Sequence, residues 1–176
     1  MPNILLRPRA VRAVEPPATS ALATVYGEAT FVDAFAIELE GPRPHDLGAL
    51  AMRALGRSGP ALRTALGLRD AAVSLFGLKT TRDIRARLLA DGGDRIGFFP
   101  VISRTEREII LGEDDAHLDF RLSLSIQPAA GGATDDLVAT TVVHCNNGLG
   151  RIYLAAIMPG HKIVARSALR KAVAAG

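Results

Sequence analysis

Residues 117–127 read HLDFRLSLSIQ, an unbroken alternation of polar and apolar side chains. Successive side chains on a β-strand point to opposite faces, so the pattern predicts a strand with one wet face and one dry face. We expect the wet face to carry the polar set, His117, Asp119, Arg121, Ser123 and Ser125. We expect the dry face, which is to lie against a helix, to carry Leu118, Phe120, Leu122, Leu124 and Ile126.

The flanking sequence predicts a larger antiparallel sheet around this strand. Apolar runs bounded by turn residues indicate further strands at 95–103, 106–112, 137–147 and 151–158. Asn147-Gly148 is a typical hairpin turn before the last of these strands. Pro159 suits the first turn of a helix. We expect this final helix to cover 159–173, with the side chains of Ile163, Val164 and Leu169 facing inward.

The first half of the chain predicts one more strand and several helices. Residues 31–40 alternate and indicate a half-buried strand, one side of which carries Phe31, Asp33, Phe35, Ile37 and Leu39. Asp46 can cap a helix that begins at Leu47, and two more helices are expected over about 60–76 and 80–91. Residues 1–30 contain four prolines and predict an N-terminal arm, whereas 31–176 are expected to form a single domain.

Three segments resemble a bacterial family, domain of unknown function 2867: FGLKT (76–80) ahead of GDRIGFFPV (93–101), GEDDAHLDFRLSLSI (112–126) and VVHCNNGLGRIYLAAIMPGHKIV (142–164). The resemblance covers roughly 30–172. It implies an α+β fold of the START-like (SRPBCC) helix-grip superfamily, a curved antiparallel β-sheet wrapped around a long C-terminal α-helix. Similar domains occur fused behind NAD(P)-binding modules like those of short-chain dehydrogenases, and the family has no established activity to carry over. The resemblance implies a phenylalanine immediately before the histidine of the final helix, where this chain has Gly160. If that phenylalanine lines a pocket in related proteins, the pocket of this chain is expected to be wider at that end of the helix.

Composition excludes several classes of function. The 21 basic and 18 acidic residues are interleaved, so no basic face for nucleic acid is predicted. No segment reaches the roughly 18 uninterrupted apolar residues of a membrane span, and no signal peptide is recognised. The single Cys145 rules out an internal disulfide, and we expect a cytoplasmic protein. The excess of arginine over lysine indicates a GC-rich bacterial genome.

His144 is the first candidate for chemistry. Pairing 117–127 with 137–147 about a turn near residue 132 places it on the dry side, where Tyr153 or Asn146 could be its hydrogen-bond partner. Such a pair can act as a general base or orient a ligand carbonyl, and a satisfied core histidine is the alternative. A register error of one residue would place His144 on the opposite face.

The remaining candidates form the expected ligand-binding set. His161, in the first turn of the final helix, is expected at the rim of the pocket, with a plain surface position as the alternative. The full set is Phe98, Leu118, Phe120, Leu122, His144, Tyr153, Ile157 and His161. The carboxylates at 113–115 suggest a metal site with His117, but a solvated turn explains them better. We therefore expect neither a metal nor a nicotinamide cofactor.

A curved sheet closed by one long helix encloses a cavity, and such cavities bind apolar molecules. The leading hypothesis is a protein that holds a small lipophilic or aromatic ligand in that cavity, either alone or as an accessory to an NAD(P)-dependent oxidoreductase. A cyclase- or hydrolase-like enzyme using His144 and Tyr153 is the second hypothesis. The third is a structural module with a filled cavity. The sequence does not decide between a monomer and a homodimer.

Overall fold

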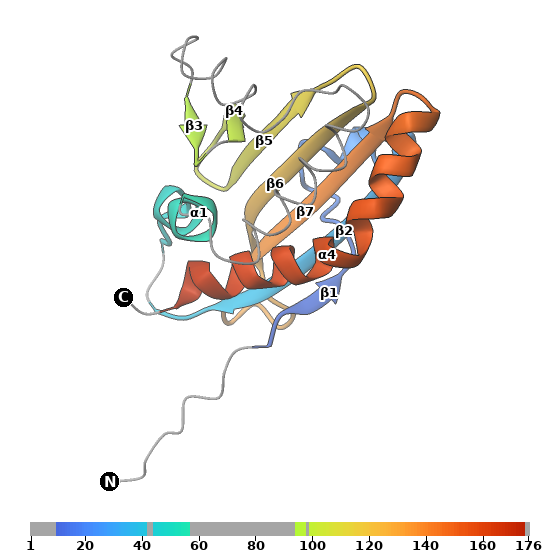
Figure 1. Ribbon diagram of the computed structural model, residues 1–176. Helices are drawn as coiled ribbons and strands as arrows, with labels where there is room; N and C mark the ends of the chain where they lie inside the picture. The colour runs from blue at the N-terminus through green and yellow to red at the C-terminus, as the bar shows by residue number, and fades with distance from the viewer. Residues whose placement is uncertain (1–9, 42–43, 57–93, 98, 175–176) are drawn as a thin grey trace, which may run out of the picture.

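The computed structural model describes residues 10–41, 44–56, 94–97 and 99–174 (Figure 1). Within them, seven strands form one antiparallel sheet in the order β1-β2-β7-β6-β5-β4-β3. The strands are β1 Arg12–Val14, β2 Phe31–Leu39, β3 Arg95–Ile96, β4 Phe99–Arg104, β5 Glu108–Asp114, β6 Leu118–Pro128 and β7 Asp135–Cys145. The helices are the short 3-10 helix η1 Ala23–Val25, α1 Leu47–Leu55 and α4 Gly148–Val173. This architecture confirms the α+β class, with a C-terminal helix across an antiparallel sheet.

The strands from 95 to 145 form the expected meander, with two differences in detail. The segment 95–103 is two strands rather than one, because Gly97 has a φ of 66° and turns the chain so that β3 pairs back on β4. The first strand of the domain, β2, joins the meander at its far side by pairing with β7. The helix predicted after Asp46 is confirmed, since the Asp46 carboxylate accepts a hydrogen bond from the Ala49 backbone at 2.9 Å. The helices expected over 60–76 and 80–91 lie outside the described residues.

The prediction of a strand over 151–158 is wrong. Asn147 caps a helix instead of turning a hairpin: its backbone is extended and its Oδ1 accepts the Gly150 N–H at 3.0 Å. Gly150 lies so close to the His117 carbonyl that a side chain would clash there. Helix α4 therefore starts eleven residues earlier than expected, and Pro159 lies inside it. A proline within a helix removes one backbone hydrogen bond, which accounts for the bend of α4 in Figure 1.

The dry face of β6 is confirmed, because it packs against both described α-helices. The main core contains Leu124 and Ile126 with Ile37 of β2, together with side chains of α1 and the last turns of α4. Leu169 is fully buried there, as predicted. Ile163, predicted to be buried, is 64% exposed, because the sheet-facing side of α4 passes through Leu154 and Leu169 rather than through this residue.

The prediction that the polar face of β6 is exposed to solvent is only partly correct. Ser123 and Ser125 are completely buried. The reason is that residues 15–30, which belong to the predicted N-terminal arm, cover part of this face. Leu22 and Tyr26 of this segment pack on Ile110 and Val142 on the outer face of the sheet. Figure 1 shows this part of the chain behind the sheet, with α4 in front of it.

Candidate functional site

An aspartate–histidine pair lies between the sheet and α4. Nε2 of His161 is 3.0 Å and 3.1 Å from the two carboxylate oxygens of Asp33. Asp33 comes from β2 and points to the helix-facing side, because it shares that side with Phe31 and Phe35. The Phe31 ring meets the imidazole edge to face, with 5.6 Å between the ring centroids. The side chains of His161 and Asp33 are 19% and 16% exposed, so the pair is neither sealed in the core nor free in solvent.

This pair separates two apolar clusters on the same side of the sheet. One cluster surrounds Val143, Cys145 and Leu154, with partly buried Phe31, Leu118, Phe120, Ile157 and Met158. The other is the main core beneath α1 and the end of α4. Thr141 of β7 is the direct cross-strand neighbour of Asp33 and is also partly exposed. Asp33, His161 and Thr141, together with Arg166 stacked over the Phe35 ring, are polar side chains in a mainly apolar surface, which is the composition typical of small-molecule sites.

The hydrogen bonds define what the pair can do chemically. A carboxylate only accepts hydrogen bonds, so Nε2 of His161 carries the proton and donates it in the hydrogen bond to Asp33. In neutral imidazole the second nitrogen, Nδ1, then carries a lone pair. Among the described residues, Nδ1 has no hydrogen-bond partner. The pair can therefore accept a hydrogen bond, or a proton, from a bound molecule.

Most of the ligand-binding set predicted from the sequence lies on this side of the sheet. Leu118, Phe120 and Ile157 belong to the cluster around Val143, and Leu122 packs against the main core. His161 is present too, although it occupies the middle of α4 rather than a first turn. Tyr153 also belongs to α4 and not to a strand. Phe98 lies outside the described residues.

The predicted side for His144 is wrong. Strands β6 and β7 pair with Leu118 opposite Cys145 and Asp119 opposite His144, one residue away from the expected register. His144 consequently points to the outer face, where it is exposed and its Nδ1 lies 3.2 Å from the Glu28 carbonyl oxygen. Tyr153 is on α4, across the sheet from His144. The structure thus does not bring the two proposed catalytic residues together.

Neither Asp33 nor Thr141 was among the site residues predicted from the sequence. Asp33 was placed on one side of its strand with Phe31, Phe35, Ile37 and Leu39, and that assignment is confirmed. The signal was an acidic residue in the apolar phase of a strand, which requires a partner because a buried charge is costly. Its partner is 128 positions away in the sequence, so only the fold identifies it.

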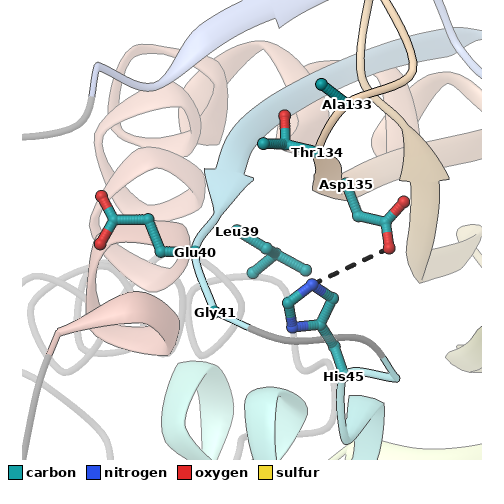
Figure 2. Close-up of a pocket in the computed structure, with 7 residues that line it drawn as sticks. All are labelled: Leu39, Glu40, Gly41, His45, Ala133, Thr134 and Asp135. Carbon is teal, nitrogen blue, oxygen red and sulfur yellow. Dashed lines mark ion pairs between the residues drawn. The ribbon is translucent and has the colours of Figure 1, made fainter.

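Figure 2 shows a second feature, an open pocket of about 370 Å³ at the end of β2. His45 precedes α1, Asp135 begins β7, and their side chains point toward each other with Nε2 and Oδ2 3.8 Å apart. The pocket is lined by Leu39, Glu40, Gly41, His45, Ala133, Thr134 and Asp135. Two carboxylates and a single large apolar side chain make it a poor match for an apolar ligand.

A third polar group, on the outer face, is centred on Glu108. Its Oε1 accepts hydrogen bonds from the hydroxyls of Ser20 at 2.5 Å and Ser123 at 2.6 Å, and its Oε2 accepts one from the Ala21 backbone at 2.9 Å. Burial raises the pKa of the nearby Tyr26 phenol above its usual range, and the negative charge of Glu108 acts in the same direction. These contacts fasten residues 20–26 to the sheet.

Side-chain contacts hold the acidic turn before β6. Arg121 forms an ion pair with Asp114 at 2.6 Å. The Asn147 amide lies 3.0 Å from Nδ1 of His117 and donates a hydrogen bond to the Ala116 carbonyl at 3.1 Å. In the part of the chain that the structure describes, no three His, Cys, Asp or Glu side chains are grouped as metal ligands.

Residues 25–168 match the family described as "Protein of unknown function (DUF2867)". The chain belongs to this family. The matched segment contains β2 through β7 and most of α4, so both Asp33 and His161 lie within the DUF2867 domain. No curated protein and no solved structure matches the chain. Of the helices described in this DUF2867 protein, none is long and apolar enough to cross a bilayer.

Proposed function

We propose that this DUF2867 protein binds a small lipophilic or aromatic molecule between the sheet and α4. The observation that carries the proposal is the helix-facing side of the sheet, which includes the Asp33–His161 pair and where large apolar side chains remain partly exposed inside the fold. Those from the sheet are Phe31, Phe99, Val101, Leu118, Phe120 and Leu122. Those from α4 are Ile157, Met158 and Val164. A START-like helix-grip fold, which we propose for this domain, holds its ligand in this position.

Physical chemistry favours an apolar occupant. Each Å² of apolar surface removed from water contributes about 25 cal/mol, so a ligand that covers several half-exposed side chains gains several kcal/mol before entropy costs. The Phe99 and Phe120 rings pack edge to face with 5.8 Å between centroids and offer further aromatic surface. Resemblance to domains fused behind NAD(P)-binding modules supports a role beside an oxidoreductase. An enzyme built on His144 and Tyr153 is not proposed, because the sheet separates them.

Titration with the neutral, environment-sensitive dye Nile red tests the proposal. We expect a stoichiometry near one and a rise in melting temperature with dye concentration, because a ligand that binds only the folded state stabilises it. Leu122→Asp should abolish binding by placing a charge on the proposed surface. Ile163→Asp is the matched control, since Ile163 is exposed on α4 and its substitution should leave binding intact.

A second variant at the same position is needed in case Leu122→Asp does not fold. Leu122→Phe keeps the site apolar but fills space, and it should weaken dye binding while circular dichroism stays unchanged. The proposal fails if neither Nile red, a long-chain alcohol nor naphthalene binds the folded wild-type protein below about 1 mM.

A further inference from the structure

We propose that the site selects a neutral aromatic ligand that carries a hydroxyl group, and that Nδ1 of His161 accepts the hydrogen bond from that hydroxyl. The inference rests on the proposed function and adds the chemical class of the ligand. It follows from three features of the same place: the direction of the Asp33–His161 hydrogen bond, the charge of Asp33 and the aromatic rings around the pair.

The hydrogen bond determines which nitrogen is free. Asp33 contacts Nε2 with both oxygens, at 3.0 Å and 3.1 Å, and therefore holds the tautomer that has its proton on Nε2. In the neutral imidazole, Nδ1 is then an acceptor without a partner among the described residues. The group that complements an acceptor is a donor, such as a hydroxyl. An ether or a ketone offers no donor and gains nothing from this nitrogen.

The charge of Asp33 excludes a second class of ligand. Its carboxylate lies within an apolar surface, where like charges repel more strongly than in water. A lipophilic carboxylate bound beside His161 meets this repulsion and loses its hydration as well. Arg166 of α4 is a cation on the same side, but its guanidinium stacks over the Phe35 ring, 5.2 Å from the ring centroid, and no ion pair joins it to Asp33 among the described residues. Neutral ligands are therefore preferred over fatty or aromatic acids.

The neighbouring side chains indicate an aromatic body for the ligand. Phe31 already packs edge to face on the imidazole, and Phe120 belongs to the same apolar cluster as Phe31. Thr141, the cross-strand neighbour of Asp33, has a hydroxyl without a hydrogen-bond partner within the described residues and can donate to the oxygen of the same ligand hydroxyl. A hydroxyl that donates to one partner and accepts from another satisfies both side chains.

Calorimetric titration at pH 7.5 with three matched compounds tests the selection. The compounds are 2-naphthol, which has the donor, 2-methoxynaphthalene, which lacks it, and 2-naphthoate, which is an anion. One net hydrogen bond predicts that the naphthol binds about 3- to 10-fold more tightly than the ether. The naphthoate should bind at least about 10-fold more weakly than the ether, because of Asp33.

Variants test whether the Asp33–His161 pair causes the preference for naphthol over the ether and the naphthoate. His161→Phe should bind naphthol and ether equally, while His144→Phe, on the opposite face, should keep the wild-type preference. Asp33→Asn should lose most of the discrimination against naphthoate, and it serves as the second probe if His161→Phe does not fold. Equal affinities in the wild type, an unchanged preference in folded His161→Phe, or tightest binding of naphthoate overturns the inference while leaving the proposed function intact. Failure of all three compounds to bind overturns both.

Discussion

Polar side chains are buried and hydrogen-bonded on the outer face of the sheet, whereas they remain partly exposed on the helix-facing side. On the outer face, the Ser20 and Ser123 hydroxyls are buried and both donate to Glu108. On the helix-facing side, Asp33 and His161 remain partly exposed, and Nδ1 of His161 has no hydrogen-bond partner among the described residues. Polar groups that the chain satisfies itself stabilise the fold, whereas groups left partly open in an apolar surface are available to a ligand. The difference distinguishes a structural network from a candidate site.

The largest effect on stability should come from the packing between α4 and the sheet. Leu169→Ala is expected to lower the free energy of unfolding by about 2–5 kcal/mol, because Leu169 is fully buried in the main core. Ile163→Ala, six residues earlier and exposed, should change it by less than about 0.5 kcal/mol. Urea unfolding of both variants measures the contrast. Similar losses in the two would show that α4 does not cover the sheet in this orientation.

Removal of Glu108 should be nearly as costly. Glu108→Ala leaves the buried hydroxyls of Ser20 and Ser123 without their acceptor, and a loss of about 2–4 kcal/mol is expected. Glu106→Ala is the matched control two residues away, since Glu106 is exposed and should cost less than about 0.5 kcal/mol. Urea unfolding again provides the measurement. A small loss for Glu108→Ala would contradict a structural role for the outer network.

The Asp33–His161 pair should contribute little to stability if it serves binding. The double variant Asp33→Leu/His161→Phe is expected to change the free energy of unfolding by no more than about 1 kcal/mol, because it removes both polar groups together and leaves neither without its partner in the apolar surroundings. The measurement is urea unfolding without ligand. A loss above about 3 kcal/mol would make the pair as structural as the Glu108 network and remove the distinction between the two faces.

The smallest effect is a dependence on alkaline pH that comes from the outer face. An unfolded chain loses its tyrosine proton near pH 10, whereas folded Tyr26 keeps its proton to higher pH because its pKa is raised. The contribution of Tyr26 is thus fully present below about pH 10 and declines as the pH rises toward the folded pKa. Tyr26→Phe should flatten this decline in urea unfolding. An identical slope in Tyr26→Phe and wild type would show that Tyr26 is not desolvated.

The strands were largely predictable from the sequence, because period-two patterns in β2 and β6 require one buried face. The segment 148–158 was not predictable in the same way, since an apolar run beside Asn147-Gly148 fits both a strand after a hairpin and a capped helix. Only the Asn147 cap and the close approach of Gly150 to His117 distinguish them. The burial of Ser123 likewise depends on residues that are remote in the sequence.

The apolar side chains of the candidate site and His161 were predicted from the sequence, whereas Asp33 and Thr141 were not. Leu118, Phe120 and Leu122 follow from alternation alone, and this is why they were placed on the correct side. The side of His144 depends on strand register, and a shift of one residue reversed it. The pairing of Asp33 with His161 depends on the tertiary packing of α4 on β2, which no local pattern encodes.

Methyl-resolved NMR during titration with 2-naphthol tests most directly the claim that the ligand binds on the helix-facing side. We expect shifts for the methyl groups of Leu118, Leu122 and Ile157, which belong to that side. We expect no change for Ile110 and Val138, which face outward. Shifts confined to the outward-facing methyl groups, or shifts near the Leu39 and Ala133 pocket alone, would contradict the account.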